Sequence, residues 1–264
     1  MRPGSVSLAT MIDPADLIVP DWPAPKAVKA LITTRRGGIS HGAYASLNLA
    51  THVGDDPLAV DENRRRVSAL MPAEPMWLDQ VHGTRVVNIS AAVCNQGQGK
   101  PTQPRADAAV TRLVNSPCVV MVADCLSILL CDERGTCVAA AHAGWRGLAA
   151  GVIERTVEGM QVAPPTVMAY LGPAIGASAF EVGQDVVDAF ALLGPDSRRA
   201  FRSITASPGK YLADIYELGR QRLTAAGVAN VYGGELCTAS APDRFFSYRR
   251  DGQTGRMAAF IWRE

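Results

Sequence analysis

Three side chains that can bind a transition metal, His82, Cys125 and His142, stand in unusual settings in this sequence. His82 follows one predicted strand, and His142 ends another. One thiolate and two imidazoles suit Zn²⁺, and three protein ligands leave a fourth coordination position open, as in catalytic zinc sites. Water in that position would have a pKa lowered to about 7. The three residues therefore form a candidate catalytic metal site, with each of them a candidate catalytic group.

The turn signal Asp132-Glu133-Arg134-Gly135 predicts a β-hairpin that would bring Cys125 and His142 together. If the hairpin is symmetric about the Glu133–Arg134 bond, positions 125 and 142 face each other with Cβ atoms about 5 Å apart. A three-residue loop with a left-handed Gly135 would shift the register by one and separate them. In a second interpretation both histidines are hydrogen-bonded core residues and Cys125 is a small buried apolar group. The spacing leaves both interpretations open, since the three residues form no local ligand motif.

A glycine-rich segment, Gly144-Trp145-Arg146-Gly147, lies between a predicted strand and a predicted helix. Backbone N–H groups at such a junction, together with the Arg146 guanidinium, can bind phosphate. The alternative is a tight connecting turn with an exposed arginine. Residues 245–252 interleave aromatic and charged side chains, which suits either a ligand contact or an edge strand. Asp124 would point away from Cys125 in a regular strand, so a role for it in the site requires a bulge.

The composition is that of a folded globular protein with a charge close to neutral. The chain has 264 residues, of which 48 % are hydrophobic and 19 % charged, and its formal net charge is +1. This excludes disordered and collagen-like chains and gives no general electrostatic reason to bind nucleic acid or an anionic membrane. No run approaches the roughly 18 apolar residues of a membrane span, and no signal-peptide core develops before Asp13 and Pro14. We therefore expect a cytoplasmic protein whose six cysteines are reduced.

Strands and helices are mixed without strict alternation, which favours an α+β fold over a doubly wound sheet. The clearest helix start is Asp56-Pro57, an N-cap acceptor followed by proline. We expect residues 1–26 to be an irregular lead-in and residues 27–264 to be the catalytic domain. The predicted strands are 27–34, 76–79, 85–90, 118–122, 127–131, 136–141, 166–171, a segment near 231, and 257–262; the predicted helices are 57–70, 147–160, 183–193 and 212–226.

Short motifs along most of the chain resemble those of one known family. In chain order they are Thr-Thr-Arg-Arg-Gly-Gly-Ile-Ser at 33–40, Ser-Leu-Asn-Leu at 46–49, Gly-Asp-Asp-Pro at 54–57, Asn-Arg at 63–64, Gln-Val-His-Gly at 80–83, Ala-Asp-Cys at 123–125, His-Ala-Gly-Trp-Arg-Gly at 142–147, Gly-Pro-Ala-Ile-Gly at 172–176 and Phe-Ser-Tyr-Arg-Arg at 246–250. Together they resemble the YfiH-like family, also called the laccase-domain or polyphenol oxidase family, whose members are described as purine nucleoside phosphorylases. The resemblance extends over residues 27–262.

The resemblance implies a single-domain, four-layer α/β/β/α sandwich with zinc held by His82, Cys125 and His142; copper can replace zinc in such a site. It implies phosphorolysis of adenosine, inosine and methylthioadenosine, a transferase activity, and deamination of adenosine, a hydrolase activity. Purine nucleosides and phosphate are then the small-molecule partners. We expect Asn48, Arg64 and Arg146 to bind substrate or phosphate, the first two on the strength of the resemblance. The sequence gives no indication of the oligomeric state.

Three other functions compete with this one. A Cys-His amide hydrolase that edits peptidoglycan precursors would use Cys125 as nucleophile and His142 or His82 as base. Copper-dependent polyphenol oxidation, the older family name, would need several coppers with mostly histidine ligands. The chain has only four histidines, two of which are already assigned, so we reject a multicopper mechanism. A non-catalytic zinc protein is disfavoured by the open coordination position.

Overall fold

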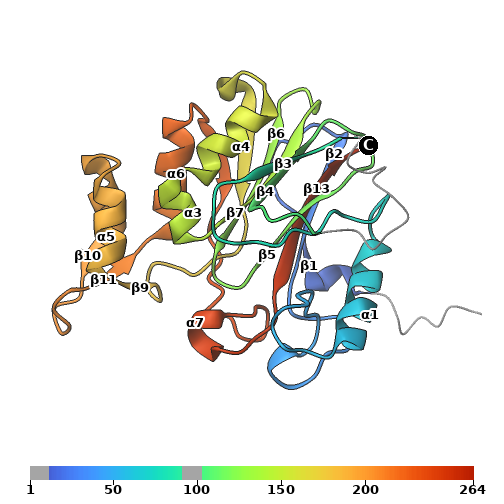
Figure 1. Ribbon diagram of the computed structural model, residues 1–264, viewed down its shortest axis with the longest axis horizontal. Helices are drawn as coiled ribbons and strands as arrows, with labels where there is room; N and C mark the ends of the chain where they lie inside the picture. Colours follow the sequence, from blue (N-terminus) through green and yellow to red (C-terminus); the bar gives the residue numbers. More distant parts are fainter. Residues whose placement is uncertain (1–11, 91–102) are drawn as a thin grey trace, which may run out of the picture.

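The strands form two stacked sheets and a smaller third one, and the helices lie outside them (Figure 1). A computed structural model describes residues 12–90 and 103–264. The strands are β1 (Leu17–Ile18), β2 (Val28–Thr33), β3 (Val86–Ile89), β4 (Ala108–Thr111), β5 (Cys118–Val122), β6 (Leu126–Asp132), β7 (Val138–Ala143), β8 (Val167–Leu171), β9 (Glu181–Gly183), β10 (Phe201–Ser203), β11 (Lys210–Ala213), β12 (Asn230–Gly233) and β13 (Met257–Arg263). The α-helices are α1 (Pro57–Ser68), α3 (Trp145–Ala150), α4 (Val152–Met160), α5 (Gln184–Ala191), α6 (Ile215–Ala225) and α7 (Tyr248–Asp251).

The two larger sheets pack face to face. The six-stranded sheet has the order β12-β8-β6-β7-β4-β3, and the four-stranded sheet has the order β1-β2-β13-β5. Apolar side chains from both sheets fill the space between them, among them Val120, Leu129, Ala140 and Ala259. Every residue of β5, β6 and β7 is buried. Strands covered on both faces need apolar side chains in both directions, which explains their continuous apolar sequences.

Helices cover the outer face of each large sheet. Helices α3, α4 and α6 pack on the six-stranded sheet, where Leu148 and Ile153 share a core with Ile128. Helix α1 lies beside the four-stranded sheet, where Val67 shares a core with Phe260. The layers therefore run helix, sheet, sheet, helix, which confirms the predicted α+β class and sandwich architecture (Figure 1).

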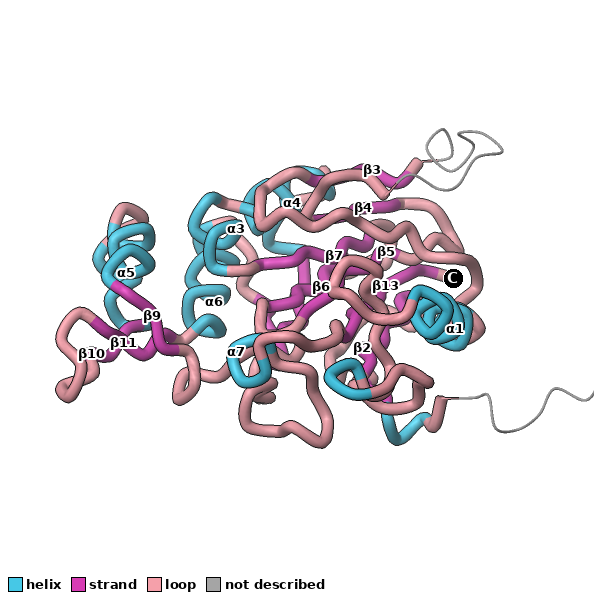
Figure 2. The backbone as a smooth tube through the Cα atoms, turned by 60° about the horizontal axis from the view of Figure 1, so that its bottom comes forward, coloured by secondary structure: helices cyan, strands magenta, loops and turns pink. Residues whose placement is uncertain are grey.

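A small unit projects from the side of the sandwich. Strands β9, β10 and β11 form a three-stranded sheet next to α5, apart from the other layers (Figure 2). The sequence predicts the helix of this unit but not its three short strands. Within residues 12–90 and 103–264, no helix has the length and apolar character needed to cross a bilayer.

The β6–β7 hairpin has a different register from the predicted symmetric one. Ser127, rather than position 125, lies opposite His142. The Asp132 carboxylate accepts hydrogen bonds from the backbone N–H groups of Thr136 and Cys137, at 2.6 and 2.8 Å, and these bonds stabilise a loop two residues longer than the predicted one. The observed register differs from the predicted one by two residues. Because side chains alternate between the two faces of a sheet, position 125 is still on the same face as His142. It lies just before the first residue of β6.

Three other predicted elements also differ. The predicted strand 76–79 has only isolated bridges, at Met76 and Asp79. The predicted helix 147–160 is two helices, because Gly151 adopts a left-handed φ of 99° and ends α3. Part of the lead-in expected to be irregular is ordered, since Leu17 and Ile18 pair antiparallel with β2; residues 1–11 lie outside the described part. The division into a lead-in and one catalytic domain stays a prediction. The five described cysteines are free thiols, and Cys94 lies outside the described residues.

Candidate active site

His82, Cys125 and His142 come together from three separate segments of the chain. His82 lies in the loop before β3, Cys125 lies between β5 and β6, and His142 is on β7. One ligand atom from each residue lies within 4.8 Å of the other two. The distance from His82 Nε2 to Cys125 Sγ is 3.7 Å, and the two imidazole centroids are 4.8 Å apart. The geometry is therefore that of a cluster able to hold one metal ion.

Two backbone features make room for this cluster. Asp124 has a left-handed φ of 87°, which interrupts the extended backbone between β5 and β6 directly before Cys125. This is the kind of irregularity that a role for Asp124 requires. Gly144 follows β7, and a Cβ at this position would lie 2.7 Å from His82 Cδ2 and 3.0 Å from Cys125 Sγ. Any side chain at position 144 would fill the space where the cluster meets.

A buried carboxylate, Asp107, contacts both histidines. Its Oδ1 lies 2.8 Å from His142 Nδ1 and accepts a hydrogen bond from the His82 backbone N–H at 2.9 Å. Its Oδ2 accepts a hydrogen bond from the Gly83 N–H at 2.7 Å. No sequence motif marks Asp107, because it lies 25 residues after His82 and 35 before His142. The pairing of β4 with β7 brings it to His142, and the pairing of β4 with β3 brings it to the turn that carries His82.

Cys125 and His142 carry coupled charges. Burial opposes a thiolate, but the charge of His142 and hydrogen bonds from both histidines outweigh it and lower the pKa of Cys125 to about 6. Burial also opposes a charged imidazole, yet the Cys125 charge and the hydrogen bond to Asp107 raise the pKa of His142 to about 9. A thiol that ionises easily beside two imidazoles is a donor set that Zn²⁺ favours. The residues present therefore fit the metal that the sequence predicts.

The cluster borders a cavity of about 250 Å³. Its wall combines aromatic, aliphatic and cationic side chains, and the lining residues outside the cluster are Ala123, Asp124, Trp145, Arg146, Ile175, Phe180, Ile215, Tyr248 and Arg249. An apolar pocket with a few convergent polar groups is typical of a site for a small organic ligand.

Two arginines line this cavity from different elements. Arg146 is the second residue of α3, and its guanidinium lies 4.4 Å from the ring centre of Trp145. Arg249 is on α7, donates to the Glu181 carbonyl and lies 5.6 Å from the ring centre of Phe180. The structure thus places Arg146 in the wall of the cavity that borders the cluster, while phosphate binding by Arg146 stays a prediction. It adds Arg249, whose only sequence signal is the mixture of aromatic and charged residues around it.

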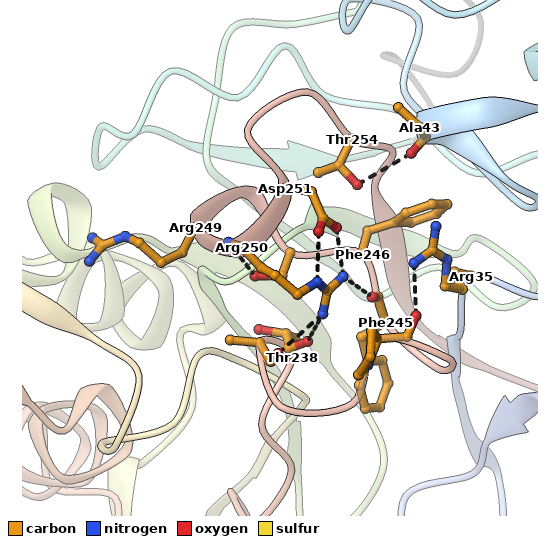
Figure 3. Close-up of polar contacts among 12 residues, drawn as sticks. Arg35, Ala43, Thr238, Phe245, Phe246, Arg249, Arg250, Asp251 and Thr254 are labelled. Atoms are coloured by element: carbon orange, nitrogen blue, oxygen red, sulfur yellow. Dashed lines mark hydrogen bonds and ion pairs between the residues drawn. The ribbon is translucent and has the colours of Figure 1, made fainter.

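The short helix that carries Arg249 is fixed by the residue that follows it (Figure 3). The Arg250 guanidinium pairs with both carboxylate oxygens of Asp251, at 2.7 and 2.6 Å. It also donates to three loop carbonyls, those of Thr238, Ala239 and Phe245. Figure 3 shows the Arg249 side chain pointing away from this network. Arg250 therefore stabilises the loop through its hydrogen bonds, whereas its neighbour Arg249 lines the cavity.

Asp124 connects the cluster to the same helix. Its Oδ2 accepts the Arg249 backbone N–H at 2.7 Å, and its Oδ1 accepts the Thr238 hydroxyl at 2.5 Å. Both carboxylate oxygens are thus used inside the protein. Asp124 anchors α7 beside Cys125 and leaves the arginines as the cationic groups of the pocket wall.

The other two predicted binding residues lie outside the cavity lining. Asn48 is fully buried, and its side-chain amide bonds to Ala50, Asp55 and the backbone N–H of Arg256. Arg64 stacks on Trp77 at 4.0 Å and donates to the Leu49 carbonyl, and burial lowers its pKa to about 10. Direct substrate contact by Asn48 or Arg64 stays a prediction. Asn48 instead positions Arg256, because its side-chain oxygen accepts the Arg256 backbone N–H. The charge of Arg256 in turn interacts with that of Cys125.

Comparison with known proteins gives full-length matches. The sequence profile of a family described as multi-copper polyphenol oxidoreductase laccase matches residues 29–264. A Pseudomonas aeruginosa protein named purine nucleoside phosphorylase is 50 % identical over 246 residues, which are 93 % of this chain and 97 % of that one. The Escherichia coli protein YfiH, also named purine nucleoside phosphorylase, is 50 % identical over 249 residues, or 93 % and 98 % of the two chains.

Solved structures match the fold equally well. A Neisseria meningitidis protein superposes with a TM-score of 0.88 and 54 % identity, covering 94 % of this chain and 99 % of that one. YlmD from Geobacillus stearothermophilus superposes with a TM-score of 0.83 and 36 % identity, covering 90 % and 93 %. The architecture described above is therefore shared over nearly the whole chain.

Proposed function

This chain belongs to the multi-copper polyphenol oxidoreductase laccase family, and from that membership and its pocket we propose that it is a zinc-dependent purine nucleoside phosphorylase that also deaminates adenosine. The names of its half-identical relatives support the phosphorylase activity. Its substrates would be adenosine, inosine and methylthioadenosine, with phosphate as the co-substrate. The observation that carries the proposal is the His–Cys–His cluster beside a cavity lined by aromatic and arginine side chains.

The wall of the cavity suits both substrates. Trp145, Phe180 and Tyr248 offer aromatic faces for a purine, and stacking of a base on an aromatic ring contributes about 1–3 kcal/mol. Arg146 and Arg249 offer N–H groups for phosphate, and arginine binds phosphate through a rigid fork of donors. Zinc held by His82, Cys125 and His142 would supply a Lewis acid at the edge of the same cavity.

Phosphorolysis requires a defined arrangement of these groups. A phosphate oxygen attacks C1′ of the ribose while the bond from C1′ to purine N9 breaks, and its electron pair leaves with the base. The phosphate must therefore lie on the ribose side, opposite the departing purine. With arginines on α3 and α7 and aromatic rings in the same wall, the cavity offers binding groups for each of the two reactants.

The histidine content opposes the oxidase chemistry in the family's description. All four histidines lie in the described part of the chain, and only His82 and His142 belong to a metal-binding group there. Two histidines and one cysteine can hold one metal ion, whereas a multicopper oxidase holds several. A single copper ion could still take the place of zinc on the same ligands.

A Cys–His amide hydrolase is the second candidate, because one observation favours it. Cys125, His142 and Asp107 have the order of a nucleophile, a base and a carboxylate that orients the base. The lowered pKa of Cys125 fits a nucleophilic thiolate. Metal content distinguishes the two candidates, since a thiolate held by zinc is not free to attack an amide.

The decisive experiment incubates zinc-loaded protein with adenosine, with and without phosphate, and separates the products by chromatography. Adenine and ribose 1-phosphate appearing only with phosphate would establish phosphorolysis, and inosine formed without phosphate would establish deamination. Cys125→Ala protein is the control and should form neither product while losing its zinc. Absence of purine products, together with amide hydrolysis that survives chelation, would replace the proposal with the cysteine hydrolase.

A further inference from the structure

We propose that Asp107 is the positioning residue of the metal centre, with one buried carboxylate that fixes the ring of His142 and holds the turn that presents His82. This inference rests on the proposed metal site. It goes further because it assigns the geometry of both histidines to a residue outside the ligand set.

The side chain of Asp107 has no exposure to solvent and makes four hydrogen bonds. Oδ1 receives His142 Nδ1–H at 2.8 Å and the His82 N–H at 2.9 Å. Oδ2 receives the Gly83 N–H at 2.7 Å and the Val81 N–H at 3.3 Å. In addition, the Asp107 carbonyl accepts the His142 backbone N–H at 2.7 Å. Three consecutive N–H groups of one turn and one imidazole thus converge on a single carboxylate.

The contact with His142 selects which ring nitrogen is free. A carboxylate can only accept hydrogen bonds, so the nitrogen facing it must carry the proton. When the ring is neutral, Nδ1 therefore holds the hydrogen and Nε2 keeps its lone pair on the side of Cys125. That is the tautomer a metal ligand needs, because coordination uses a nitrogen without a proton.

The contact with the turn determines where His82 points. His82 has a left-handed φ of 59°, a conformation that residues other than glycine rarely adopt. The convergence of its own N–H and those of Val81 and Gly83 on Asp107 stabilises this conformation. Without the carboxylate, these three N–H groups would lose their acceptor, and the left-handed conformation of His82 would no longer be stabilised.

The test compares Asp107→Asn with Asp132→Asn. The first keeps the size of the side chain but replaces one acceptor oxygen with an N–H donor that faces other donors. Asp132 is a matched control, since it is also buried and also accepts backbone N–H groups, at the other end of the β6–β7 hairpin. Zinc affinity is measured by chelator competition, and folding by thermal melting. We expect Asp107→Asn to bind zinc about 10- to 100-fold more weakly, and Asp132→Asn to melt earlier while its zinc affinity stays that of wild type.

A second measurement needs no variant and no metal. ¹⁵N NMR of the zinc-free wild-type protein, at a pH where the His142 ring is neutral, reports which ring nitrogen is protonated. We expect a proton on Nδ1. A proton on Nε2, or an Asp107→Asn protein with wild-type zinc affinity, would overturn the positioning role. If wild-type protein binds no zinc but His142 shows the Nδ1–H form, the metal proposal fails, while the orientation of the His142 ring by Asp107 stands.

Discussion

At the scale of single residues, the charge of Cys125 governs how the site behaves without metal. With its pKa lowered to about 6 by the neighbouring histidines, the thiol is a thiolate at neutral pH. We expect alkylation of zinc-free protein by iodoacetamide to rise with pH through about 6 and to be level above it, since only the thiolate reacts. Zinc should suppress the reaction. Mass spectrometry of the alkylated peptide measures the rate.

Two controls accompany this pH profile. His142→Gln removes the charge that lowers the pKa, so its midpoint should move upward toward that of a free cysteine, about 8.5. Cys118, whose pKa is raised by burial, should remain unmodified throughout. A wild-type midpoint near 8.5 would contradict the coupling between Cys125 and His142.

Arg146 allows a second test at this scale, this time of substrate binding. Charge-assisted contacts with phosphate contribute about 1.5–3 kcal/mol, so Arg146→Ala should raise the KM for phosphate tenfold or more. The KM for the nucleoside should change little. Arg155→Ala is the control, because Arg155 is an exposed residue of α4 that pairs with Glu158. An unchanged phosphate dependence would transfer the anion-binding role to another group, with Arg249 the first to examine.

At the scale of elements, the junction between β7 and α3 is the sensitive point of the site. Gly144→Ala would place a Cβ 2.7 Å from His82 Cδ2, closer than side chains pack. We expect zinc content to fall well below one per chain while the far-ultraviolet circular dichroism spectrum stays native. Gly159→Ala on α4 is the matched control, since its Cβ would meet Val86 and Val110 at an ordinary 3.5 and 3.7 Å. Full zinc content in Gly144→Ala would mean that the cluster can move apart without loss.

The elements also show where sequence reasoning succeeds. The capping residues Asp56 and Pro57 locate the start of α1, because the Asp56 side chain accepts the Leu58 N–H. The apolar runs locate β5, β6 and β13, because strands covered on both faces must be apolar throughout. These signals are local, and each can be seen within a dozen residues of sequence.

What sequence reasoning misses depends on contacts between distant residues. The hairpin register is two residues off because a side chain, Asp132, enters the turn. Asp107 has no local pattern, since its partners lie in other segments. Arg249 is set against the cavity by a bond from its backbone to Asp124, 125 residues away in sequence. The clustering of His82, Cys125 and His142, by contrast, could be predicted, because these residue types are chemically distinctive and their surroundings resemble a known family.

At the scale of the whole molecule, the predicted metal links segments that belong to different parts of the fold. Removal of zinc by a strong chelator should therefore lower the melting temperature as well as abolish purine chemistry. A ligand at 100 times its Kd stabilises the native state by about 2.7 kcal/mol, and each 1 kcal/mol shifts the melting temperature of a domain of this size by about 2–4 °C. Differential scanning calorimetry measures the shift. Cys125→Ala should melt at one temperature with or without chelator, and a wild-type protein that does the same, with its activity intact, would show the chemistry to be metal-free.

The scattering of the three ligands along the chain has a consequence for how the protein matures. Cys125 and His142 border one hairpin, but His82 lies 43 residues before Cys125, so no short piece of newly made chain presents all three ligands in position. An unfolded chain can offer a metal ion only isolated side chains, which compete poorly with other chelators in a cell. We therefore expect metal loading to follow the pairing of β3, β4, β6 and β7, rather than to drive folding as it does in a zinc finger. Bound metal would thus mark the molecules that have completed their assembly.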